Sequence, residues 1–180
     1  MEQKNFSLYN KVKMLKTAPI IFIHIDTTGL GVDDEVVRLS IISDGLLLYD
    51  EIYHTNRPIN EQAARISGIS QQDIFDSDVY IRDEISSLKN MLADKLLICV
   101  NDVFTKKFLA RSGLDIDDKN LLDLTKATDF FASGFIKSSR DMLSFYGYDV
   151  KAAETTFDRN FAFYDCAWKL KTMANSFLKE

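Results

Sequence analysis

The chain has 180 residues, a formal net charge of −5, 46% hydrophobic residues and 27% charged residues. This composition is ordinary for a soluble globular protein, and the length suits one domain with a full core. The acidic balance argues against broad electrostatic binding to nucleic acid, which rests on lysine and arginine. Cys99 and Cys166 indicate neither a disulfide framework nor a cysteine-rich zinc site. Since no signal peptide or bilayer-spanning segment is evident, we expect a cytoplasmic protein without a membrane partner.

Residues 1–17 form a basic, weakly amphipathic lead-in that we expect to be solvated or loosely docked. Residues 18–180 are expected to form a single domain.

The first half of the domain predicts three antiparallel strands. β-branched and aromatic residues fill 20–26, 36–42 and 46–53, and Asp44-Gly45 is a hairpin signal between the last two. After these strands, Gly68 ends a short helix over 61–66. Ser70 and Asp73 form a capping-box pair that starts another short helical turn.

The second half alternates helices and strands, which predicts two parallel strands after the three antiparallel ones. Asp158 is the expected N-cap of the last helix. The fold class is therefore α/β, a mixed sheet flanked by helices. The predicted elements are a helix over 79–92, a strand over 96–100, a helix over 102–112, a strand over 121–124, helices near 125–133 and 138–146, and a long helix over about 159–178.

A candidate site lies where the first strand ends. His24 and Asp26 alternate with apolar residues and so point to the same face, beside the turn Thr27-Thr28-Gly29. Ligands of open α/β sheets bind where strands stop, although ordinary polar residues at a strand end would give the same pattern.

The order of these signals resembles the DnaQ-like (DEDDh) 3′–5′ exonuclease family, which has a ribonuclease H-like fold. The resemblance covers nearly the whole chain after the lead-in. The stretch 23–30 is similar to the family's Asp-x-Glu-Thr-Thr-Gly-Leu, and 100–109 to its Asn-x-x-Phe-Asp-x-x-Phe-Leu. The stretch 58–74 resembles the family's proline, short helix and Gly-Ile turn, Leu122-Asp123-Leu124 resembles its Asp-Thr-Leu strand, and Asn160–Asp165 falls on its His-x-x-x-x-Asp.

The departures from this pattern fall on the residues that do chemistry. Family members hold two divalent ions with four carboxylates and use a histidine as general base. Here His24 replaces the first aspartate, Asp26 the glutamate, Thr105 the second-motif aspartate and Asn160 the base, while Asp165 matches without change.

The resemblance implies a weakened metal site. Asp26, Asp165 and His24 are the remaining candidate ligands, for Mg²⁺ or Mn²⁺, and imidazole suits Mg²⁺ poorly. Asn160 cannot accept a proton near neutral pH. Rescue by Asp102, one turn before Thr105, or by Asp158 is an alternative. The implied substrate-binding residues are Thr27, Thr28, Gly29, Leu30, Asn101 and Thr105.

Three functions remain open from the sequence. The leading hypothesis is a protein of weak or no activity that binds nucleic acid or protein, with or without a divalent metal. In that case Lys106, Lys107 and Arg111 could contact phosphates, although a solvated helix face is the simpler interpretation of this cluster. The second is an active exonuclease acting on a single-stranded 3′ end with an altered metal site. The third is a subunit that pairs with a protein partner or with itself through its last helix, which carries Trp168, Leu170, Met173 and Phe177.

Overall fold

The computed structural model describes residues 2–149 and 156–178, and it confirms the predicted mixed sheet. Five strands lie in the order β3-β2-β1-β4-β5. β1 pairs antiparallel with β2 and β2 with β3, whereas β1–β4 and β4–β5 are parallel. The strands are β1 (Ile20–Thr27), β2 (Val36–Ser43), β3 (Leu46–Ile52), β4 (Leu96–Cys99) and β5 (Leu121–Asp123).

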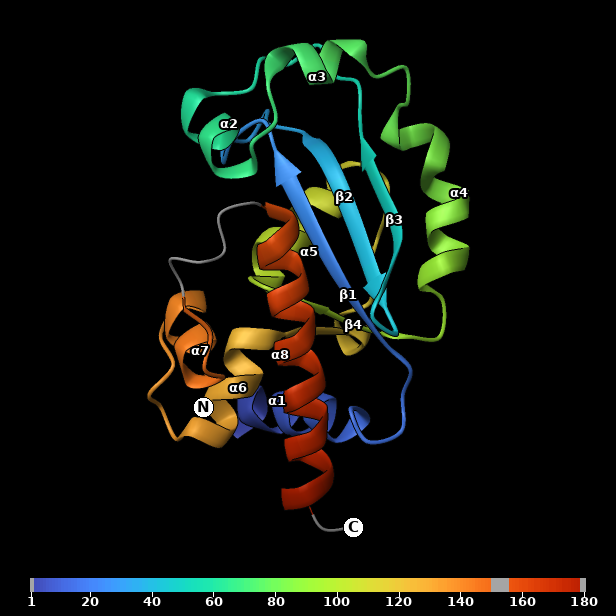
Figure 1. Ribbon diagram of the computed structural model, residues 1–180. Helices are drawn as coiled ribbons and strands as arrows, with labels where there is room; N and C mark the ends of the chain where they lie inside the picture. Colours follow the sequence, from blue (N-terminus) through green and yellow to red (C-terminus); the bar gives the residue numbers. More distant parts are fainter. Residues whose placement is uncertain (1, 150–155, 179–180) are drawn as a thin grey trace.

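Helices cover both faces of this sheet, as Figure 1 shows for α8 on one side and α4 on the other. The helices are α1 (Glu2–Met14), α2 (Glu61–Ser67), α3 (Gln71–Asp76), α4 (Ile81–Leu92), α5 (Asp102–Arg111), α6 (Leu124–Ala132), α7 (Ser139–Phe145) and α8 (Thr156–Phe177), with a 3₁₀ turn over Asp118–Asn120. No helix in the described ranges has an apolar stretch long enough to cross a membrane.

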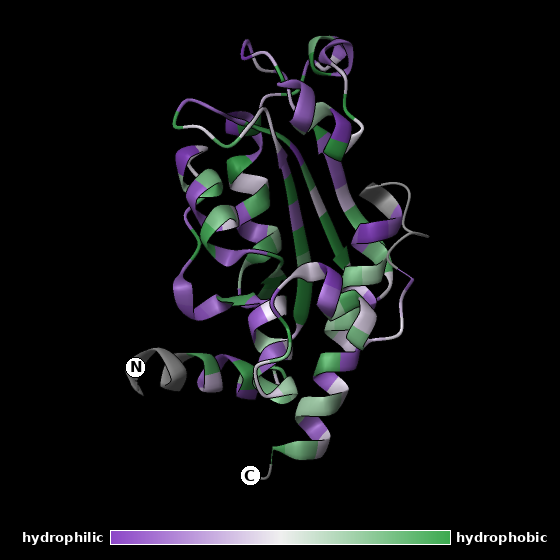
Figure 2. Ribbon diagram, turned by 90° about the vertical axis from the view of Figure 1, so that its left-hand side faces the viewer, coloured by the Kyte–Doolittle hydropathy of each residue, from purple (hydrophilic) through white to green (hydrophobic). Residues whose placement is uncertain are grey.

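The alternation of side chains along β1 divides the core into two layers. Phe22 belongs to the layer that includes α1, α6, α7 and α8. Ile21 and Ile23 belong to the layer that includes α4 and α5. Figure 2 shows the central strands mostly in the hydrophobic colour. Because both faces of β1 are packed over most of its length, its polar carboxyl end is held in a fixed position.

Local capping signals behave as the sequence predicts. Gly68 ends α2 with a left-handed φ of 75°, which glycine adopts without steric cost. Ser70 and Asp73 form the capping box at the start of α3. The prediction that Asp158 caps the last helix is wrong, because α8 already begins at Thr156 and Asp158 lies in its first turn.

The N-terminal segment differs from its expectation. Val12 and Leu15 are fully buried in the core layer beneath α8, so the end of α1 is packed on the sheet domain and is not loosely docked. In the last helix, Leu170 is fully buried against the chain's own core, while Trp168 and Phe177 are exposed.

Candidate functional site

A cleft opens at the carboxyl end of β1, between α2, α5, α7 and α8. It consists of two adjoining cavities of about 390 and 440 Å³ that share His24, Ile25, Asp26, Ile66 and Phe104. The polar side chains of the first cavity include His24, Asp26, Thr105, Arg140, Arg159 and Asn160. The second cavity is lined by residues that include Thr27, Gly29, Leu30, Asn60, Ile66 and Phe104.

His24 and Asp26 form the polar end of β1. His24 Nε2 lies 3.3 Å from Asp26 Oδ1. The other carboxylate oxygen, Asp26 Oδ2, is buried and has no hydrogen-bond partner. A buried polar atom without a partner costs free energy, so this oxygen is available to a ligand that brings a donor or a cation.

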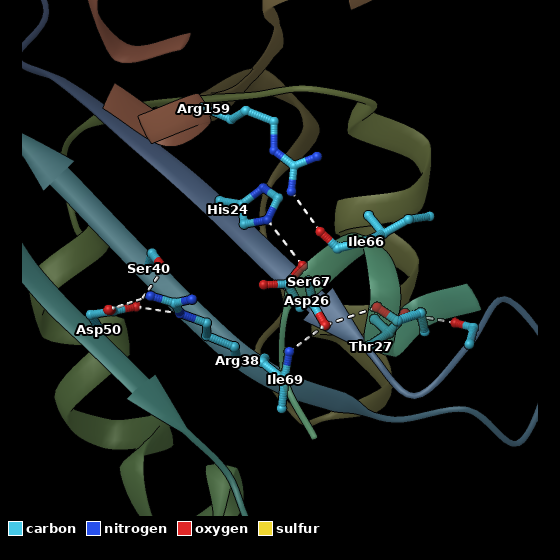
Figure 3. A network of polar contacts seen from close by, with 12 residues as sticks. His24, Asp26, Thr27, Arg38, Ser40, Asp50, Ile66, Ser67, Ile69 and Arg159 are labelled. Atoms are coloured by element: carbon cyan, nitrogen blue, oxygen red, sulfur yellow. Dashed lines mark hydrogen bonds and ion pairs between the residues drawn. The ribbon is translucent and has the colours of Figure 1, made fainter. Parts of the chain in front are cut away.

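The neighbouring strands carry a charged network next to this pair (Figure 3). Arg38, which is paired with Asp26 across the strands, donates to both oxygens of Asp50 at 2.7 and 2.6 Å, and Ser40 donates to Asp50 at 2.6 Å. Burial alone would raise the pKa of Asp50, but the hydrogen bonds from Arg38 and Ser40 lower it. The charge of Arg38 is thus held by Asp50 on the sheet and does not line the cleft.

Two of the predicted positions on other elements reach the cleft. Thr105, on α5, is 2% exposed, and Asn160, on α8, is also 2% exposed. The side-chain oxygen of Asn160 has no hydrogen-bond partner. His24, Asp26, Thr105 and Asn160 therefore come together from three elements, as four of the substituted motif positions.

Asp165 is not brought to the cleft. Its carboxylate accepts hydrogen bonds from the Tyr148 hydroxyl and, at 3.0 Å, from Lys169. Burial alone would raise the pKa of Asp165, but these two bonds lower it. Five residues along a helix rotate a side chain by about 140°, and of this pair only Asn160 lines the cleft. The motif pattern groups Asp165 with Asp26, whereas the structure places Asp26 in the cleft lining and Asp165 outside it.

Part of the predicted substrate-binding turn lines the cleft, and part of it is buried in the fold. Gly29 and Leu30 line the second cavity, as does Thr27, whose hydroxyl donates to Gly29 O at 2.6 Å. A Cβ on Gly29 would clash with the Asn60 side-chain nitrogen and would lie 2.6 Å from Asp34 Oδ2, so a larger residue here would displace these two side chains. Thr28 is fully buried and donates to Asp34 at 2.8 Å, which gives it a structural role.

Other residues proposed from the sequence have structural partners. Asn101 lies outside the cleft lining and caps α5, accepting from Phe104 N at 3.1 Å. Asp102 accepts from Lys126 at 2.5 Å and lines a different surface pocket, so it does not replace the second-motif carboxylate. Lys106 pairs with Asp118 at 2.6 Å, and Arg111 donates to Gly31 O at 3.1 Å.

Two arginines of the cleft were not predicted. Arg159 extends from the first turn of α8 and donates to Ile66 O of α2 at 2.5 Å, above His24 in the view of Figure 3. Arg140 lies on the first turn of α7 and is exposed. Arg159 could have been found from the sequence, because it directly precedes Asn160 in the stretch that resembles the third motif. No feature of the sequence indicated Arg140.

The donor set of the cleft does not fit a two-metal centre. Among the described residues that line it, Asp26 is the single carboxylate, against two permanently charged guanidinium groups. No group of three His, Cys, Asp or Glu residues that could hold a metal ion occurs within the described part of the chain. Two divalent ions would bring four positive charges to one anionic side chain.

Comparison with solved structures identifies the fold. Exonuclease X, in complex with duplex DNA carrying a 5′ overhang, is similar with a TM-score of 0.62 and 17% identity, covering 89% of this chain and 94% of that chain. A full-length 3′-exonuclease has a TM-score of 0.61 and 13% identity, covering 87% and 82%. E. coli exonuclease I with a dT oligonucleotide has a TM-score of 0.62 and 14% identity, covering 87% of this chain and 41% of that chain.

No protein-family model matches the chain, and no curated protein does so by sequence. The fold is the one that these exonuclease structures share, a ribonuclease H-like mixed sheet flanked by helices.

Proposed function

We propose that this protein, built on a DnaQ-like exonuclease fold, binds the 3′ end of single-stranded nucleic acid in the cleft and hydrolyses it weakly or not at all. The observation that carries the proposal is the side-chain content of the cleft. The fold keeps a cleft at the carboxyl end of β1, yet His24, Thr105 and Asn160 stand in it where the family motifs have ionisable catalytic groups.

The loss of hydrolysis follows from the chemistry of these groups. Phosphodiester hydrolysis by two metals needs anionic ligands on both ions and a base that takes a proton from water. Thr105 offers a neutral hydroxyl, and the Asn160 amide is not a base near neutral pH.

The binding half of the proposal is supported by the shape and lining of the second cavity. Leu30, Ile66 and Phe104 supply apolar and aromatic surface beside the polar end of β1. A base can stack on such a surface, and stacking contributes about 1–3 kcal/mol per base in single-strand binding. The solved complexes of exonuclease X and exonuclease I contain DNA, which favours a nucleic acid as the ligand here.

A second candidate is a weak exonuclease that uses one divalent ion, Mn²⁺ in preference to Mg²⁺. The buried, unpaired Oδ2 of Asp26 favours it, because a cation would satisfy this oxygen. Asp26 and His24 would hold the ion.

One experiment tests both candidates. A 5′-labelled single-stranded DNA or RNA oligonucleotide is incubated with the protein in EDTA, Mg²⁺ or Mn²⁺, and binding is followed by fluorescence anisotropy on the same samples. Salt-dependent binding with an intact oligonucleotide supports the proposal. Laddering from the 3′ end that requires metal supports the second candidate. An absence of binding at low salt in every sample overturns both.

A further inference from the structure

The polar groups that line the cleft are of two kinds, hydrogen-bond acceptors without partners and positively charged donors. Asp26 Oδ2 and Asn160 Oδ1 are buried acceptors without partners. Arg140 and Arg159 are donors that stay protonated at all physiological pH values. A ligand that satisfies both must carry hydrogen-bond donors at one end and negative charge at the other.

The charge balance of the cleft points to an anion. Asp26 contributes one negative charge, and the two arginines contribute two positive charges, so the first cavity has a net positive charge whether or not His24 is protonated. The whole chain carries −5, so this positive charge is local to the cleft. A concave site of one sign concentrates ligands of the opposite sign.

A hydrogen bond to the backbone of α2 restrains the position of Arg159. Its Nη2 donates to Ile66 O at 2.5 Å, which connects the first turn of α8 to the last turn of α2 across the cleft. A guanidinium group held in this way loses little side-chain entropy when it binds a phosphate, for which its planar fork is well suited.

We infer that Arg140 and Arg159 bind a phosphate of the nucleic-acid end directly, in place of the two-metal centre that the donor set of the cleft does not fit. In this arrangement a sugar hydroxyl donates to Asp26 Oδ2 or Asn160 Oδ1, and the terminal base lies against Phe104. This inference rests on the proposed function and adds that binding needs no divalent cation.

The test measures the affinity of a fluorescein-labelled single-stranded oligonucleotide in EDTA and in Mg²⁺, for the wild type, Arg140→Ala, Arg159→Ala and Arg159→Lys. Arg82→Ala is the matched control, because Arg82 is 73% exposed and lines a pocket outside the cleft. Melting curves establish that each variant is folded.

We expect equal wild-type affinity in EDTA and Mg²⁺, and a loss of about tenfold or more in each alanine variant, the effect of removing a charged hydrogen bond. Arg159→Lys should lose less, because it keeps the charge. The salt dependence of log K should flatten by about 0.7 per lost phosphate contact, while Arg82→Ala binds as the wild type does.

Two results separate failure of this inference from failure of the proposed function. Binding that requires Mg²⁺ or Mn²⁺, or that is unchanged in both alanine variants, overturns the arginine site but leaves nucleic-acid binding intact. A wild type that binds no oligonucleotide in either buffer overturns the proposed function as well.

A 3′-phosphorylated oligonucleotide should bind more weakly than its 3′-hydroxyl counterpart, because its terminal phosphate would lie next to Asp26. Equal affinity for the two would contradict the placement of the hydroxyl.

Discussion

His24 and Asp26 lie two residues apart on β1, and their side chains approach to 3.3 Å between Nε2 and Oδ1. Among the described residues that line the cleft, Asp26 is the single carboxylate. The contact with His24 uses its Oδ1, whereas its Oδ2 is buried and has no hydrogen-bond partner. A divalent ion or a sugar hydroxyl of a bound nucleic acid would each give Asp26 Oδ2 the partner that it lacks.

The first prediction separates Asp26 from Asp165. Any metal-dependent release of nucleotides should be abolished by Asp26→Ala and should survive in Asp165→Asn, because the Asp165 carboxylate is held by Tyr148 and Lys169 away from the cleft. The measurement is laddering of a 5′-labelled oligonucleotide in Mn²⁺. If Asp165→Asn loses activity while Asp26→Ala keeps it, Asp165 belongs to the metal site, contrary to its position outside the cleft.

The second prediction concerns Asn160, whose buried oxygen lacks a donor. We expect Asn160→Leu to leave the free energy of unfolding unchanged or to raise it by about 1–2 kcal/mol, because an unsatisfied polar group is replaced by an apolar one of similar size. Oligonucleotide binding should fall in the same variant.

Asn60→Ala provides the matched control for Asn160→Leu. The Asn60 oxygen caps α2 by accepting from Ala63 N at 2.8 Å, so its loss should destabilise the protein by about 1 kcal/mol. Urea denaturation measures both. A clear destabilisation by Asn160→Leu would mean that the Asn160 oxygen has a partner in solution.

The third prediction tests the packing of the N-terminal segment. Leu15 is fully buried, so Leu15→Ala should lower the free energy of unfolding by about 2–5 kcal/mol. Asn10→Ala, at an exposed position of α1, should change it by less than about 0.5 kcal/mol. If both substitutions change the free energy of unfolding by equally small amounts, the N-terminal segment is loosely docked, as the sequence had suggested.

The fourth prediction concerns pH. Hydrogen bonds from Arg38 and Ser40 hold the pKa of Asp50 below its ordinary value of 3.8. A carboxyl with a lowered pKa in the folded state stabilises the protein above the unfolded-state pKa, and this contribution is lost as the pH falls through the folded-state value. Asp50→Asn should therefore be less stable than the wild type at pH about 6, and the difference should shrink as the pH falls below about 4. A difference that is constant over this range would contradict the ion pair.

The sequence by itself determined the five strands, the order of the helices after residue 17, and the end of β1 as the candidate site. Strand alternation has a period of two, so His24 and Asp26 had to share a face wherever the strand was placed. Capping at Gly68 and Ser70 is equally local, because each depends on neighbours within one turn of helix.

Only the tertiary structure decided which groups on α7 and α8 face that site. A helix rotates about 100° per residue, so Asn160 and Asp165 point in different directions, and the placement of α8 decides that Asn160 lines the cleft. Arg140 and Arg159 come from separate helices and meet β1 only through packing of the core, which no local pattern encodes. The motif matches gave the fold, whereas the chemistry of the cleft depends on rotations that a sequence motif does not specify.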